Sequence, residues 1–81
     1  MNESKSKNLA ALGRLIKQRR RSLGISQEEL GFRANLDRTY ISGLERGVRN
    51  PSFTALMSLA KGFDISVSEL LENLEGEVNK L

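Results

Sequence analysis

The 81-residue sequence predicts an all-α fold, a compact bundle of five short helices. Apolar residues recur three or four positions apart along most of the chain, which is the spacing of helices that bury one face. Ser, Asp, Asn and Gly stand where these segments would begin and end, as helix-capping residues do. Apolar and polar residues nowhere alternate for long enough to predict a strand.

The first helix is expected to begin at Leu9 and to end at Gly24, a residue that readily adopts the left-handed conformation. Residues 1–8 are polar and are expected to form a flexible tail before a single domain over residues 9–81. The buried face of this helix is expected to carry Leu9, Leu12, Ile16 and Leu23.

The second helix is expected from Ser26 to about Ala34. Ser26 and Glu29 have the spacing of a capping box, in which each side chain accepts a hydrogen bond from the backbone N–H of the other. Asn35 tolerates the left-handed conformation and is expected to make a sharp turn after this helix.

The third helix is expected to begin after its cap, Asp37, and to run to Arg46 before Gly47. Together with the second helix it has the spacing of a helix-turn-helix, whose second helix enters the DNA major groove. Gly31 is expected where the two helices cross. The apolar positions of this pattern are Leu30, Leu36, Ile41 and Leu44.

Two more helices are expected after Pro51, which excludes a continuous helix through the preceding loop. Ser52 is expected to cap the fourth helix, and Ser66 with Glu69 forms a second capping box that opens the fifth. The apolar residues expected on these helices are Phe53, Leu56, Ala60 and Phe63, followed by Leu70, Leu71, Leu74 and Val78.

Positive charge is concentrated in the part of the chain that contains the predicted helix-turn-helix. Residues 1–50 hold eleven Lys and Arg against five Asp and Glu, whereas residues 51–81 hold two against five. This asymmetry predicts a polyanion on one side of the molecule. The alternative, that the run Arg19–Arg21 is an ordinary solvated helix face, remains open.

The composition argues against several classes of function. Without Cys there is no disulfide or thiolate chemistry, and without His the usual zinc sites and the commonest general base are missing. No apolar run approaches the ~20 residues that span a bilayer, and the N-terminal residues lack the apolar segment of a secretory signal. We therefore expect a cytoplasmic protein that is not an enzyme, with no cofactor, no metal and no membrane partner.

Residues 9–74 resemble the phage repressor and Cro family of helix-turn-helix regulators, also called Xre-type. The segments that carry the resemblance are LGRLIKQRRRSLGISQEELG, LERGVRNPS and LMSLAKGFDIS. Within this family, NLDRTYISGLERGVRNPS is most similar to controller proteins of restriction–modification systems. The resemblance implies a lambda-repressor-like domain with a central helix-turn-helix. It also implies a transcriptional regulator that binds a near-palindromic DNA operator as a homodimer.

Base contacts are expected from the exposed face of the third helix. Arg38 can donate two hydrogen bonds to the O6 and N7 atoms of guanine. Thr39 suits either a thymine methyl group or a phosphate, and both interpretations remain open. Ser42 and Gly43 have so little bulk that the helix can approach the groove closely.

Phosphate contacts are expected from the residues around this face. Ser26 and Gln27 begin the second helix, where free amides and the helix dipole favour a phosphate, and the resemblance implies that Gln27 is an anchor. Tyr40 either packs beneath the third helix or extends its hydroxyl to the DNA backbone, and we favour the second. The full predicted set is Ser26, Gln27, Tyr40, Arg46, Arg49, Asn50 and Ser52.

Glu45 needs a different role, because a carboxylate that points at DNA would be repelled. The resemblance implies that it faces inward and pairs with Arg20, joining the third helix to the first.

The C-terminal helix carries more apolar residues than so small a domain easily buries. Some of them are expected to form a two-fold dimer interface, although they could instead complete the core of the monomer. The candidates are Ile65, Val67, Leu70, Leu71 and Leu74. A dimer would hold two recognition helices about 34 Å apart, the spacing of half-sites one helical turn apart.

The expected partners are operator DNA and a second copy of the chain, with RNA polymerase added if the protein activates transcription. The alternative is a protein-interaction module, such as an antitoxin, for which DNA binding is secondary. Only residues 75–81 follow the domain, which argues against an added partner-binding segment.

Overall fold

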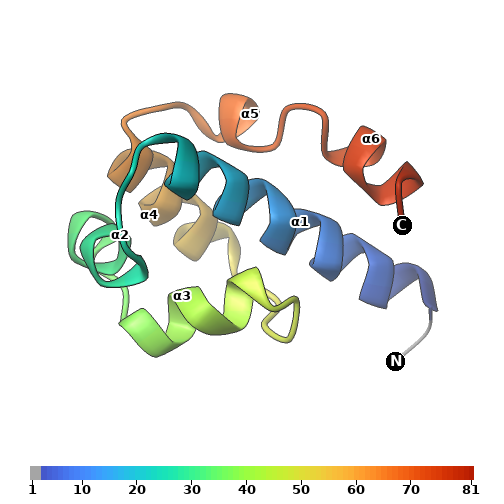
Figure 1. The fold of residues 1–81 in the computed structure, drawn as a ribbon, viewed down its shortest axis with the longest axis horizontal. Coiled ribbons are helices and arrows are strands. Elements are labelled where there is room, and N and C mark those ends of the chain that lie inside the picture. Colours follow the sequence, from blue (N-terminus) through green and yellow to red (C-terminus); the bar gives the residue numbers. More distant parts are fainter. Residues whose placement is uncertain (1–2) are drawn as a thin grey trace.

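The computed structural model describes residues 3–81, with side chains from residue 6 onward, and all its regular elements are helices (Figure 1). These are α1 (Glu3–Ser22), α2 (Gln27–Ala34), α3 (Arg38–Glu45), α4 (Phe53–Phe63), α5 (Val67–Leu70) and α6 (Leu74–Asn79). The predicted all-α fold is confirmed, and the described residues contain six helices where five were expected.

The first helix begins at Glu3 rather than at Leu9. The expected tail over residues 1–8 is therefore wrong from residue 3 onward, while the first two residues lie outside the described part of the chain. Polar residues extend the helix toward the N-terminus. This part of α1 lies near α6, since Asn8 borders a hollow between the two helices.

Four helices end with the same hydrogen-bonded turn. In each, a residue with positive φ follows the helix, and the next N–H donates to the carbonyl five residues earlier, as in a Schellman motif. The predicted left-handed positions Gly24, Asn35 and Gly47 are confirmed, with φ of 69°, 56° and 78°. Asp64 closes α4 in the same way with φ of 60°, which the sequence did not indicate.

The core lies where α1, α2, α3 and α4 meet, and α5 covers it through Leu70. Its largest fully buried side chains are Ile16, Leu30, Ile41, Leu44, Leu59 and Leu70. Each stabilises the fold by about 1.5–3 kcal/mol relative to an exposed position. Leu23, predicted on the buried face of the first helix, is instead 50% exposed, and Phe53 at the start of α4 is 68% exposed. Leu23 follows the last residue of α1 and Phe53 is the first residue of α4, so neither side chain packs into the core.

The predicted C-terminal helix is divided into α5 and α6. The capping box that opens α5 is confirmed, because Ser66 and Glu69 exchange bonds of 3.1 Å from backbone N–H to side chain. Asn73 then adopts a φ of 65°, which a continuous right-handed helix does not allow.

The break at Asn73 lets α6 return along α1, and there the carboxylate of Glu77 is buried. Its partners are Arg14 at 3.4 Å, Gln18 at 3.5 Å and Lys80 at 3.3 Å. The contacts with Arg14 and Gln18 fix the C-terminal helix against the first helix.

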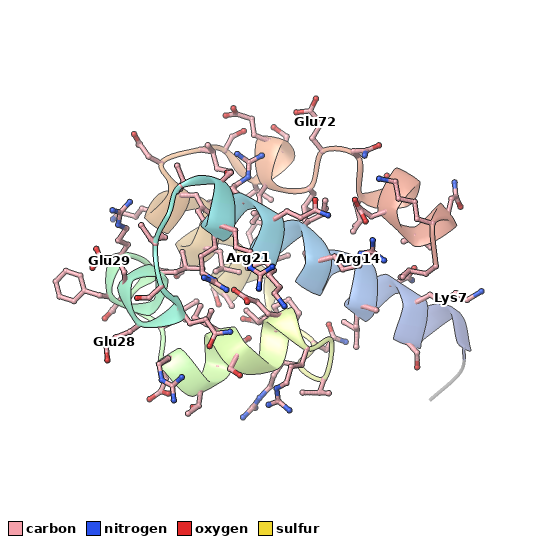
Figure 2. All side chains as sticks on the ribbon, in the orientation of Figure 1. Lys7, Arg14, Arg21, Glu28, Glu29 and Glu72 are labelled. Carbon is pink, nitrogen blue, oxygen red and sulfur yellow. The ribbon has the colours of Figure 1, made fainter. Side chains whose placement is uncertain are left out.

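The helices α3 and α6 contact α1 from opposite sides (Figure 1). The acidic C-terminal part therefore lies away from α3, and Figure 2 shows Glu72 at the edge of the molecule opposite α3. Within the described residues, no helix is long and apolar enough to cross a bilayer, and no cluster of three His, Cys, Asp or Glu could hold a metal ion.

Candidate nucleic-acid interface

The turn between α2 and α3 depends on Gly31, Asn35 and Leu36. The left-handed Asn35 lets the Leu36 N–H donate to the Gly31 carbonyl at 2.8 Å. A Cβ on Gly31 would lie 2.6 Å from the Leu36 carbonyl oxygen, a backbone atom. Glycine is thus required by the turn itself, and not by the crossing of two helices that the sequence suggested.

The helix α3 buries one face and exposes the other, as predicted. Ile41 and Leu44 are in the core, whereas Arg38 and Thr39 are exposed in the first turn. Ser42, the third predicted base contact, is half-buried. The exposed face is therefore concentrated at the start of α3, the end of a recognition helix that contacts base edges in helix-turn-helix proteins.

Gly43 does not lie on this exposed face. It is buried, and a Cβ there would lie 2.6 Å from Cγ of Arg49. The Arg49 side chain crosses α3 at this point, and its Cζ lies 5.6 Å from the centroid of the Tyr40 ring, a cation–π distance. The glycine therefore makes room for an arginine from the following loop, so the expectation that Gly43 itself contacts a base needs correction.

The ring of Tyr40 packs beneath the third helix, which is the first of the two alternatives considered from the sequence. The ring is half-buried against the core and lies beneath Arg49. It also borders a hollow between the starts of α3 and α4, together with Ser52 and Thr54. Ser52 caps α4 by accepting the Ala55 N–H at 3.1 Å, and it remains exposed.

Arg20 and Glu45 join α1 to α3, as the resemblance implied. The guanidinium donates to both carboxylate oxygens, with Nε–Oε2 of 2.6 Å and Nη2–Oε1 of 3.0 Å. The two side chains are only 12% and 3% exposed. The hydrogen bond to Glu45 raises the pKa of Arg20 above its ordinary value despite the opposing effect of burial. This ion pair fixes the orientation of the recognition helix.

Gln27 takes part in the same junction. Its side-chain amide donates to Oε1 of Glu45 at 3.1 Å, so the side chain points into the protein. The expected phosphate anchor therefore needs correction at the side chain, and only the backbone N–H of Gln27, at the first position of α2, suits that role.

The predicted capping box at the start of α2 is half present. Ser26 Oγ accepts the Glu29 N–H at 3.0 Å. The Glu29 carboxylate instead pairs with Arg33 one turn later, with Nε–Oε2 of 3.0 Å, so the reciprocal bond was predicted wrongly. An ion pair within the helix has displaced the cap interaction.

The remaining predicted phosphate contacts follow the C-terminal end of α3. Arg46, Arg49 and Asn50 are all exposed, and the loop that carries them leaves α3 toward α4 (Figure 1). The exposed candidate residues between Arg38 and Ser52 thus lie at the two ends of the recognition helix and in the loop that follows it.

The candidate dimer residues do not share one environment. Leu70 is 2% exposed and belongs to the core of the monomer, so it is not free to contact a second chain. Leu74 lines the hollow between α6 and α1. Ile65 and Val67 are half-buried and line a groove beside α4, together with Met57, which is 48% exposed. Leu71 is half-buried against the core.

Three contributions escaped prediction from the sequence. A Cβ on Gly13 would lie 2.5 and 2.6 Å from the carbonyl oxygens of Leu44 and Glu45, so this glycine allows α1 and α3 to approach closely. The cation–π contact of Arg49 and the exposure of Met57 are the other two. Only the glycine left a signal, as an isolated glycine inside a helical pattern.

Comparison with known proteins identifies the family of the chain. A family model described as "Helix-turn-helix" matches residues 16–70. The chain belongs to this helix-turn-helix family. It is 39% identical to "Control protein C.MunI" of Mycoplasma sp. over 64 residues, which are 79% of this chain and 86% of that protein.

Two solved structures of a restriction–modification controller protein, C.Esp1396I, have the same fold. The wild-type protein is 39% identical with a TM-score of 0.81, covering 91% of this chain and 96% of that chain. A tetramer of C.Esp1396I in complex with its natural 35-base-pair operator is 39% identical with a TM-score of 0.80, covering 89% and 95%. These relatives confirm the predicted resemblance to controller proteins and the predicted fold.

Proposed function

We propose that this chain is a sequence-specific DNA-binding transcriptional regulator that acts as a homodimer on a near-palindromic operator, as the controller protein of a restriction–modification system. The observation that carries the proposal is the start of α3, where Arg38 and Thr39 are exposed beside the Tyr40–Arg49 contact. The relatives that share the fold include a controller bound to its operator.

Arg38 is the main proposed reader of a base. It stands at the first position of α3 and is exposed, so its guanidinium is free to donate two hydrogen bonds to one guanine. Thr39 lies beside it, and Ser42 allows the helix to approach the groove. Gly43 contributes by leaving space for Arg49.

Phosphate contacts are proposed from both ends of the motif. The backbone N–H groups at the start of α2 meet one phosphate, with Ser26 beside them. Arg46, Arg49 and Asn50 meet the backbone beyond α3, and Ser52 with the Tyr40 hydroxyl meets it near the hollow. Each neutralised phosphate releases counterions, so affinity is expected to fall steeply with salt concentration.

The groove lined by Met57, Ile65 and Val67 is proposed as the dimer interface. It combines exposed and half-buried apolar groups, whereas the Leu70 side chain serves the core of the monomer. Two chains joined there would present two recognition helices to half-sites one helical turn apart.

RNA polymerase is proposed as a further partner in the case of activation, and the cytoplasm as the location where the operator is met. The position of the operator relative to the promoter would decide between activation and repression. Transcription reconstituted from purified components would separate the two.

The first test is selection of bound duplexes from a random DNA library. A palindromic consensus that binds two chains supports the proposal. Arg38→Ala is expected to lose one guanine preference in each half-site and about tenfold or more in affinity, while remaining folded. Arg33→Ala, which removes the same charge from α2, is the matched control and should keep the consensus.

A protein-interaction module is the second candidate, because Phe32 on α2 is 83% exposed. If no duplex is enriched and binding is only weak and salt-sensitive, the regulator proposal fails. A folded partner protein would then be sought, with Phe32→Ala as the variant that abolishes its binding.

A further inference from the structure

Asp37 and Thr39 make two hydrogen bonds at the start of the recognition helix. The Thr39 N–H donates to Oδ1 of Asp37 at 2.8 Å, as expected for a helix cap. The Thr39 hydroxyl donates to the same oxygen at 2.5 Å. Capping requires only the first of these bonds. The second fixes the hydroxyl of a residue that is exposed on the proposed reading face.

The direction of the second bond is settled by chemistry. An ionised carboxylate only accepts hydrogen bonds, so the hydroxyl must donate to it. The two bonds from Thr39 hold the pKa of Asp37 below its ordinary value, with the charge of Arg38 acting in the same direction, so the carboxylate is ionised at neutral pH. The single hydrogen of the Thr39 hydroxyl is therefore already in use.

A similar pair of hydroxyl groups in the described chain lacks this constraint. Ser52 and Thr54, at the start of α4, lie 3.2 Å apart with their hydroxyl oxygens, and either can donate. Ser66 and Ser68, at the start of α5, lie 3.0 Å apart, but there the Ser66 hydroxyl also donates to Oε1 of Glu69 at 3.2 Å, so a carboxylate constrains that pair too. A carboxylate at the cap of α3 is what fixes the direction of the bond there.

We propose that Asp37 is a specificity-determining positioning residue, which prevents Thr39 from donating a hydrogen bond to DNA and so makes the facing operator position discriminate against guanine. Guanine presents only acceptors, O6 and N7, in the major groove. With its hydrogen in use, the Thr39 side chain offers these guanine atoms only lone pairs and a methyl group. Adenine and cytosine can donate an amino hydrogen to the hydroxyl oxygen, and thymine can contact the Thr39 methyl group with its own. A phosphate, which also requires a donor, is excluded as the partner of this hydroxyl.

The inference rests on the proposed function and deepens it. Arg38 and Thr39 become adjacent residues of opposite character, one that only donates and one that only accepts. Neighbouring bases of an operator can thereby be distinguished by the first turn of α3 alone.

The experiment measures dissociation constants on four versions of the selected operator that differ only at the position read by Thr39. That position is the one whose preference changes in Thr39→Val, which keeps the branched shape without the hydroxyl. Asp37→Gly frees the hydroxyl, and glycine costs a helix cap only slightly relative to Asp. The double variant Asp37→Gly/Thr39→Val completes the cycle, and thermal melts check that all four proteins are folded.

The expected result is that the wild type binds the guanine version about tenfold more weakly than the best version. Asp37→Gly should reduce this ratio to about twofold, because the released hydroxyl can donate. In the Thr39→Val background, Asp37→Gly should leave the ratio unchanged, which separates the effect from capping and from any influence on Arg38.

Three results would overturn the inference while leaving the proposed function intact. One is guanine as the preferred base at this position, and another is no position that responds to Thr39→Val. The third is an equal effect of Asp37→Gly with and without the Thr39 hydroxyl. Absence of any enriched duplex for the wild type would instead reject the proposed function, and this inference with it.

Discussion

Glu45 is the residue on which three helices converge. It accepts two hydrogen bonds from Arg20 of α1 and one from Gln27 of α2, while belonging to α3 itself. Its side chain is 3% exposed, so these bonds replace almost all of its hydration. A buried ion pair contributes little net stability, but removing one partner leaves the other charge without compensation.

Glu45→Ala is therefore expected to lower the free energy of unfolding by about 3 kcal/mol, since Arg20 is left almost buried and unpaired. Urea or thermal unfolding measures the loss. Arg38→Ala, at an exposed position, should change stability by less than about 0.5 kcal/mol. Equal stability of the two variants would contradict the role assigned to Glu45.

A substitution at Gly43 is expected to affect thermal stability and operator affinity differently. Gly43→Ala gains up to about 1 kcal/mol of helix propensity, but its Cβ meets the stem of Arg49 at 2.6 Å. Arg49 is then expected to move off the Tyr40 ring, so that operator affinity falls at least fivefold while the melting temperature does not decrease. Titration of labelled operator and thermal melts on the same sample test both parts. Unchanged affinity would show that the position of Arg49 is unimportant.

At the scale of elements, the short helices are defined mainly by their ends. Most caps could be read from the sequence, because Ser26, Asp37, Ser52 and Ser66 each accept a backbone N–H as predicted. The break at Asn73 could not, since apolar spacing continues through it and only the packing of α6 on α1 favours the left-handed residue. The ion pair of Glu29 with Arg33 could not be predicted either, because side-chain geometry decides whether Glu29 bonds to Arg33 or to the backbone N–H of Ser26.

Gly31→Ala is expected to destabilise the protein by more than about 1 kcal/mol despite its better helix propensity. The new Cβ would meet a backbone carbonyl, so the α2–α3 turn must open. Gly76→Ala is the matched control, because its Cβ meets only the flexible amide of Asn73. Thermal melts of both variants decide the matter, and equal stability would show that the turn adapts.

The exposure of candidate site residues could be predicted where they lie in a regular helix, as for Arg38 and Thr39. Contacts between side chains from different segments of the chain could not be predicted. Arg49 lies in a loop, and no periodicity indicates that it crosses Gly43 and reaches Tyr40. Gln27 was misassigned for the same reason, because its bond to Glu45 joins residues 18 positions apart.

At the scale of the whole molecule, charge and apolar surface are segregated. The segment around α3 carries exposed arginines, whereas α6 and the acidic C-terminal residues lie on the other side of α1 (Figures 1 and 2). The groove at Met57 belongs to α4 and the segment that follows it. This separation is compatible with simultaneous dimerisation and DNA binding.

Met57→Glu is expected to convert the protein from two chains to one at micromolar concentration and to weaken operator binding more than tenfold, since each half-site would then be bound separately. Met57 is 48% exposed, so the core is spared. Sedimentation and operator titration provide the readouts. Leu23→Glu, at an exposed leucine outside the groove, should remain dimeric. A Met57→Glu protein that sediments as wild type would place the interface elsewhere.

The passage of Arg49 over α3 has a consequence for protein engineering. Grafting the eight residues Arg38–Glu45 onto another helix-turn-helix scaffold would transfer the helix without the arginine that lies across it. The smallest transplantable unit extends from Asp37 to Arg49, since it must include both the residue that orients Thr39 and the side chain that covers Gly43. Exchange of DNA specificity between relatives therefore requires the loop to move together with the helix.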